Sequence, residues 1–108
     1  MRRDVFQAIA DPTRREIINL IAHQTLTLNG VADSFHTSRQ AISKHIKILT
    51  ECGIVVMKQQ GRERYCVVQP ESLDEVHDWL EGFRKIWETR FSQLDEVLST
   101  LKERKNEK

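Results

Sequence analysis

Two short amphipathic helices that follow one another almost without a gap are the feature that most constrains this sequence. Thr27 and Ser38 are predicted to begin them, because a hydroxyl side chain can accept a hydrogen bond from a free N–H of the first turn. Only His36 and Thr37 separate the two helices, and Gly53 suits the left-handed cap that ends the second. The apolar residues at helical spacing are Leu28, Val31, Ala32 and Phe35 in the first helix and Ile42, Ile46 and Leu49 in the second. This arrangement, with a basic second helix, predicts a helix-turn-helix motif.

The segments on either side of the motif extend it to a small domain. Asp11 followed by Pro12 predicts the start of a helix that runs to about Ala22, preceded by a shorter helix. After Gly53 the apolar runs 54–57 and 65–68 enclose a polar loop that contains a glycine, which predicts a β-hairpin, or wing, over about 54–69. Residues 1–70 are therefore expected to form the core of a winged helix-turn-helix domain, mainly α with a small hairpin.

The C-terminal third carries an apolar stripe that is too long for one small domain to bury. From Leu73 to Leu101, apolar residues recur at steps of three and four, which predicts a single helix over 72–104. We expect this helix and the first one to form a homodimer interface within one domain of 108 residues. The expected interface residues are Val5, Phe6, Ile9, Leu80, Phe83, Trp87, Phe91, Leu94 and Leu98.

The net charge of +1 conceals an uneven distribution along the chain. Residues 1 to 70 hold ten Lys and Arg against six Asp and Glu, whereas residues 71 to 108 hold seven against ten. The positive surplus is concentrated between Arg39 and Arg64, where six cations face only Glu51 and Glu63. A local basic patch in a nearly neutral protein indicates an anionic partner, for which double-stranded DNA is the expectation.

The predicted second helix and the wing supply residues suited to DNA. At about 100° per residue, Gln40, Ser43, Lys44 and Lys47 lie opposite Ile42, so they should face outward. Gln can pair with adenine edges and Arg with guanine, while Lys and Ser hold phosphates, and a wing arginine can reach a minor groove. The expected DNA-binding residues are Ser38, Arg39, Gln40, Ser43, Lys44, Lys47, Lys58, Arg62 and Arg64.

Other classes of function find little support. His45 has no Asp, Ser or Cys placed to complete a catalytic set, so we expect neither an enzyme nor a cofactor. Cys52 and Cys66 are isolated in the sequence and are expected to be reduced thiols, with a redox role left open. The chain has no apolar run of the ~20 residues that a membrane span needs, and we expect a cytoplasmic protein.

Three stretches together resemble the ArsR-type bacterial repressors. They are DPTRREII, SRQAISKHIKILTECGIV and GRERY, and the resemblance runs from about Val5 to Pro70. It implies a dimeric winged helix protein that binds an inverted-repeat operator and leaves when a signal arrives, although the sequence identifies no inducer. The C-terminal stretches DWL, FRKIWETRF and QLDEVL look like the metal-independent branch, whose members resemble autorepressors often encoded beside a small membrane or START-like protein.

The sequence departs from the metal-sensing members of that family. The stretch LTLNGVADSF lacks their cysteine pair, and Glu75 with His77 imitates only half of their other site, since Trp87 stands ten residues after His77. Half a site cannot supply the four ligands of a zinc ion, so no metal site is expected. The alternative to a repressor is an interaction module whose winged domain no longer binds DNA, but it would have little reason to keep its charge concentrated around Arg39 and Lys47.

Overall fold

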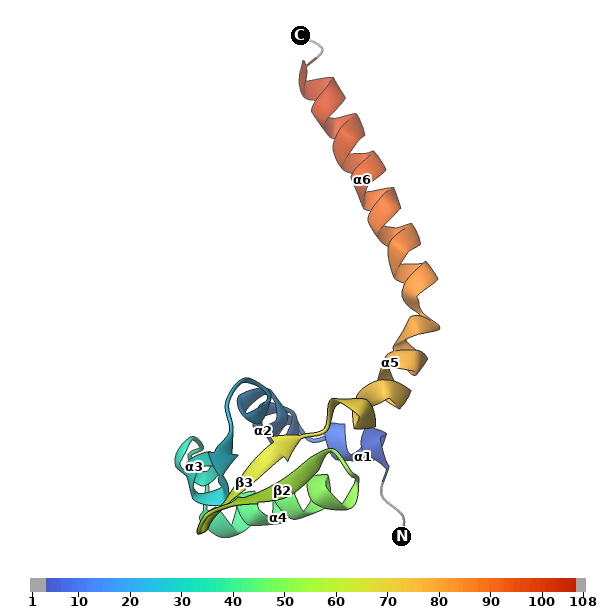
Figure 1. Ribbon diagram of the computed structural model, residues 1–108. Helices are drawn as coiled ribbons and strands as arrows, with labels where there is room; N and C mark the ends of the chain where they lie inside the picture. The colour runs from blue at the N-terminus through green and yellow to red at the C-terminus, as the bar shows by residue number, and fades with distance from the viewer. Residues whose placement is uncertain (1–3, 107–108) are drawn as a thin grey trace. The chain divides into compact units, whose positions relative to one another are not determined.

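The computed structural model describes residues 4–106, so residues 1–3 and 107–108 of the predicted domain lie outside the described part. The chain divides into two units, Met1–Val76 and His77–Lys108. The elements are α1 (Val5–Ile9), α2 (Pro12–His23), β1 (Leu26–Thr27), α3 (Leu28–Asp33), α4 (Arg39–Glu51), β2 (Val55–Gln60), β3 (Glu63–Val68), η1 (Pro70–Leu73), α5 (Asp74–Glu81) and α6 (Arg84–Asn106). In the first unit, α2, α3 and α4 gather beside the small sheet (Figure 1). The predicted fold class, mainly helical with a small hairpin, is confirmed.

Capping side chains begin the helices where the sequence predicts. Asp11 accepts a hydrogen bond from the backbone N–H of Arg14 at 3.0 Å, and Pro12 occupies the first helical position of α2. Thr27 caps α3 and Ser38 caps α4 in the same way, each accepting an N–H at 3.1 Å. A further capping box at Asp4, with Gln7, begins α1.

Replacing Asp11 with alanine is expected to lower the free energy of unfolding by about 1 kcal/mol at neutral pH, because a free N–H of α2 loses its acceptor. The hydrogen bond from the Arg14 backbone, together with the nearby charge of the Arg14 guanidinium, lowers the pKa of Asp11. A carboxyl whose pKa is lowered in the folded state stabilises the fold at pH values above its ordinary pKa. This contribution is lost as the pH falls through the pKa of the folded state. Urea unfolding at neutral and strongly acidic pH should therefore show the deficit of Asp11→Ala shrinking in acid. Asp11→Asn, which keeps an acceptor, serves as the control, and a deficit independent of pH would contradict this assignment.

Helix α4 ends with the glycine cap that the sequence predicts. Gly53 has a φ of +80°, and the N–H groups of Gly53 and Ile54 donate to the carbonyls of Thr50 and Leu49 at 3.1 and 3.0 Å. These two bonds form the Schellman arrangement, in which a left-handed residue turns the chain out of the helix. Gly53 thereby directs the chain into the hairpin.

The sheet has three antiparallel strands in the order β1-β3-β2. The hairpin pairs Val55 with Val68 at its base and Gln60 with Glu63 at its tip, confirming the predicted wing. A two-residue loop joins the strands, and its first residue, Gly61, takes the positive φ of +63° that suits a type II′ turn. The pairing of β1 with β3 was not predicted, because a strand of two residues is too short to show alternation.

One apolar core holds the first unit together. Ile17 and Ile21 of α2, Ile42 and Leu49 of α4, and Val55 of β2 all lie in it. Its remaining buried members are Val5, Ala8, Ile18, Val31, Ile46, Ile54 and Cys66. The predicted apolar face of α4 is thus the face that packs on the rest of the domain.

Helix α3 is shorter than predicted. It ends at Asp33 and does not reach Phe35, so the turn before Ser38 is longer than the two residues expected. The Ser34 hydroxyl donates to the carbonyl of Gly30 at 3.1 Å, and the backbone N–H of Ser34 donates to the carbonyl of Val31 at 3.0 Å. A serine that bonds to the preceding turn competes with continuation of the helix, which the apolar spacing alone did not reveal.

The prediction of one C-terminal helix over 72–104 is wrong. The segment forms η1, α5 and α6, and Gly82 and Phe83 interrupt the helical stretch, their N–H groups donating to Trp79 and Leu80 at 3.2 and 2.9 Å. A glycine lowers the stability of a helix interior, and the apolar period continues through the break, so the stripe did not show it. Across residues 4–106, none of the helices combines the length and apolar character needed to cross a bilayer.

Candidate nucleic-acid interface

Helix α4 presents a polar face opposite its buried one. Ile42, Ile46 and Leu49 are buried in the core, as predicted. The residues predicted to face outward are all exposed: Arg39, Gln40, Ser43, Lys44 and Lys47. Ser38 is exposed as well, and its oxygen accepts the N–H of Ala41 at the start of α4.

The structure brings these outward-facing residues, apart from Ser38, around one shallow surface hollow. The hollow has a volume of about 500 Å³ and is lined by Leu28, Arg39, Gln40, Ser43, Lys44 and Lys47. Three of the lining side chains are cationic and none is acidic, so the hollow favours an anionic partner. It also places an amide and a hydroxyl among the cations, a combination that can both hold phosphates and contact base edges.

The wing residues do not share one face of the hairpin. Lys58 lies opposite Tyr65 and Arg64 lies opposite Gln59, and residues at adjacent positions of a strand point to opposite faces. Lys58 and Arg64 therefore project from different sides of the wing, whereas Arg62 stands in the loop. All three cations are exposed, and the wing offers charge on two faces and at its tip.

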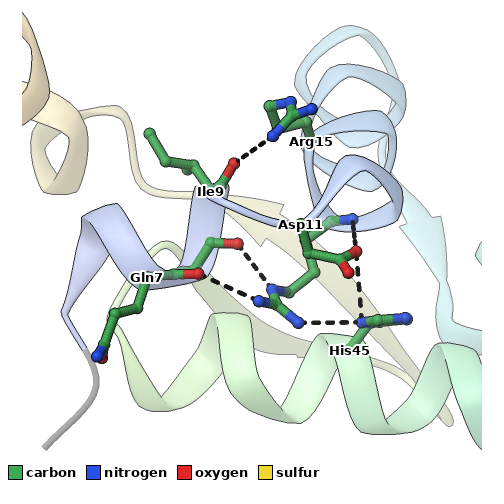
Figure 2. A network of polar contacts seen from close by, with 7 residues as sticks. Gln7, Ile9, Asp11, Arg15 and His45 are labelled. Carbon is green, nitrogen blue, oxygen red and sulfur yellow. Dashed lines mark hydrogen bonds and ion pairs between the residues drawn. The ribbon is translucent and has the colours of Figure 1, made fainter.

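A polar network that sequence reasoning missed joins α4 to the N-terminal helices (Figure 2). Nδ1 of His45 lies 3.3 Å from Nη1 of Arg14 and 4.0 Å from Oδ2 of Asp11. Arg14 also donates to two carbonyls of α1. The sequence signal was weak, because Arg14 and His45 are 31 residues apart and each suits an ordinary surface position.

The predicted dimer residues fall into two groups. In α1, Val5 is buried in the core of its own chain, while Phe6 and Ile9 are only partly buried. Ile9 also lines an apolar hollow of about 230 Å³, together with Ile18, Leu73 and Val76. The residues predicted in the second unit remain substantially exposed: Leu80, Phe83, Trp87, Phe91, Leu94 and Leu98. Trp79, Ile86, Val97 and Leu101 widen this exposed apolar surface, and the ring centroids of Trp79 and Phe83 are 5.1 Å apart.

The cysteines and histidines do not assemble a sensor in the described part of the chain. Cys66 is fully buried, and burial raises the pKa of its thiol, which disfavours the reactive thiolate. Cys52 is half-buried at the end of α4. His77 lies 3.6 Å from Asp78 and 3.5 Å from Glu81, but no three potential ligands gather closely enough to hold a metal ion among residues 4–106.

Comparisons with known proteins agree with this geometry. The model of the bacterial regulatory protein ArsR family matches residues 11–56. The chain is 31% identical over 80 residues to the transcriptional repressor SdpR of Bacillus subtilis, covering 74% of this chain and 89% of that protein. It is 33% identical over 89 residues to an HTH-type transcriptional regulator of Mycobacterium tuberculosis, covering 82% and 83%. The solved structure of an ArsR-like transcriptional regulator from Rhodococcus superposes with a TM-score of 0.67 at 30% identity, covering 86% of this chain and 88% of that one. The chain therefore belongs to the ArsR family of bacterial regulatory proteins, and it is a DNA-binding transcriptional regulator with a winged helix-turn-helix fold.

Proposed function

We propose that the protein is a homodimeric repressor that binds an inverted-repeat operator. The observation that carries this proposal is the outer face of α4, where Arg39, Gln40, Ser43, Lys44 and Lys47 surround one hollow while the opposite face is buried. In the complex, α4 enters the major groove. Gln40 and Arg39 read base edges, while the lysines and serines hold phosphates.

The wing supplies the second contact with DNA. Arg62 in the exposed two-residue loop reaches into the adjacent minor groove or against its phosphates. Lys58 and Arg64, on opposite faces of the hairpin, contact the backbone on either side. Residues 1–70 thus serve as the DNA-binding part.

The exposed apolar surface of α5 and α6 supports a homodimer. Phe83, Trp87 and Phe91 are between 39% and 66% exposed, and aromatic residues exposed in a continuous set are typical of an interface with another protein. A two-fold dimer presents two recognition helices to DNA, so its operator is an imperfect palindrome with half-sites about 10 base pairs apart. Residues 72–104 serve as the dimerisation part, with Phe6 and Ile9 of α1 joining the interface.

The relatives support the biological role that we propose. SdpR is a transcriptional repressor, and the present chain aligns with most of its length. We assign the same action here, in the form of autorepression in the cytoplasm, where bacterial DNA lies. No metal ion is assigned to this function, because Glu75 and His77 supply only half of the ligands that a zinc ion needs.

The proposal is tested by sequencing the genomic fragments that the purified protein retains. We expect an imperfect palindrome to be enriched, and the protein to bind a duplex of that sequence as one dimer, more tightly than a scrambled duplex. Specific binding typically exceeds nonspecific binding by a factor of roughly 10³ or more at physiological salt. Retention without any enriched sequence would favour the interaction module over the repressor.

A further inference from the structure

Arg14 connects three elements through one side chain. Its Nε donates to the carbonyl of Ala8 at 2.7 Å, and its Nη2 donates to the carbonyl of Gln7 at 3.1 Å (Figure 2). Both carbonyls lie at the end of α1, where the Gln7 carbonyl also accepts the backbone N–H of Ala10 at 3.3 Å. The remaining terminal nitrogen, Nη1, lies 3.3 Å from Nδ1 of His45 on α4.

The chemistry of this last contact fixes which partner donates. A guanidinium has only donors, so Nδ1 of His45 acts as the acceptor of this hydrogen bond. Asp11 completes the cluster, because its Oδ2 accepts the backbone N–H of Arg14 at 3.0 Å and lies 4.0 Å from the same ring nitrogen. The cap of α2, the end of α1 and the middle of α4 therefore meet at one point.

The other contacts that hold α4 to the domain are less directional. Ile42, Ile46 and Leu49 are buried against apolar neighbours, and apolar burial is roughly proportional to area and insensitive to angle. Such burial holds one face of α4 against the domain but supplies no bond of fixed direction. The hydrogen bond at His45 depends on distance and angle, so it adds a directional restraint on the rotation of α4.

We propose that Arg14 and His45 are positioning residues for DNA reading, which together fix the orientation at which α4 presents Gln40 to the operator. The proposal rests on the function proposed above. It concerns sequence preference, because base edges are read through hydrogen bonds with strict geometry, whereas phosphate contacts by long cations tolerate a small shift. His45 does not itself contact the bases. It affects the preference for the operator sequence only through the orientation of α4.

Two variants of His45 separate this role from plain stability. Asparagine can place its Oδ1 near the position of the ring Nδ1, so His45→Asn keeps an acceptor for Arg14, whereas His45→Leu removes it. We expect His45→Leu to lose about tenfold in affinity for the selected operator, the scale of one hydrogen bond to a charged group. Its affinity for scrambled DNA and the salt dependence of binding should remain unchanged, and His45→Asn should restore most of the preference.

A matched pair of arginine variants provides the control. Arg15 also donates to the end of α1, to Ile9 at 2.8 Å, but the structure gives it no bond to α4 among the described residues. Arg14→Lys keeps its charge but cannot span three acceptors, so it should lose operator preference, whereas Arg15→Lys should keep it. These variants also provide the test if His45→Leu fails to fold, as judged by thermal unfolding.

Three outcomes would overturn the inference. The first is a His45→Leu variant whose operator preference is unchanged. The second is a His45→Leu variant that loses affinity equally for both duplexes and shows a weaker salt dependence, which would make His45 a phosphate contact. The third is equal operator preference in Arg14→Lys and Arg15→Lys. None of these would affect the proposed function. That function fails only if the wild-type protein itself shows no preference for any duplex.

Discussion

Trp87→Ala is expected to convert the protein from a dimer to a monomer at micromolar concentration. Trp87 is 43% exposed, and its ring centroid lies 6.4 Å from that of Phe83, which is also exposed. Truncation of an aromatic residue at the centre of an interface typically costs about 2–4 kcal/mol, which weakens dimerisation by a factor of roughly 30 to 1,000. Sedimentation velocity over a range of concentrations measures this change directly.

The same helix offers a control for this variant. Thr89 is exposed on α6 but does not belong to the apolar surface, so Thr89→Ala should leave the dimer intact. The Trp87 variant should also lose operator affinity, because a monomer holds only one half-site at a time. A wild-type protein that sediments as a monomer at micromolar concentration, or a Trp87 variant that dimerises as tightly as wild type, would contradict the assigned interface.

Gln40→Ala should reduce operator binding selectively. Loss of a base contact typically costs about 1–3 kcal/mol, and a symmetric dimer loses it in both half-sites. Gln40 is exposed in the hollow of α4, without a side-chain role in the fold, so the stability of the protein should not change. Binding isotherms on operator and scrambled duplexes should show a large loss on the first and little on the second.

Lys47→Ala and Arg62→Ala should behave differently from Gln40→Ala. Both side chains are exposed cations assigned to the DNA backbone, so their loss should weaken binding to both duplexes alike. The slope of log affinity against log salt should fall by about one for each phosphate that the variant no longer neutralises. Lys102→Ala, which removes an exposed cation outside the predicted DNA-binding residues, is the control. Equal loss on both duplexes for Gln40→Ala would remove it from the reading role, and unchanged binding for all these variants would favour the interaction module.

Local chemistry explains why so much of the first unit could be predicted. A capping residue acts within one turn, so Asp11, Thr27 and Ser38 marked helix starts without any knowledge of the tertiary structure. Gly53 did the same for the end of α4. The outward face of α4 followed from the helical period once those limits were known.

The features that the sequence did not reveal depend on distant or competing contacts. The pairing of β1 with β3 and the contact of Arg14 with His45 join segments far apart in the chain, and no local pattern encodes them. The break at Gly82 is a different case, since a single glycine is tolerated inside many helices and the apolar stripe continued past it. Val5 shows the same limit, because an apolar residue in a short helix suits the core of its own chain as well as an interface.

The two residues of the wing loop have different roles, since Gly61 sets the backbone turn and Arg62 supplies the charge. Gly61 takes the left-handed backbone conformation that the turn requires, so a side chain there would be strained, whereas Arg62 meets no such demand. Position 62 can therefore exchange charge or size without refolding the hairpin, and position 61 cannot. Among proteins descended from this one, the charge at the wing tip can therefore change in a single substitution while the hairpin beneath it stays the same.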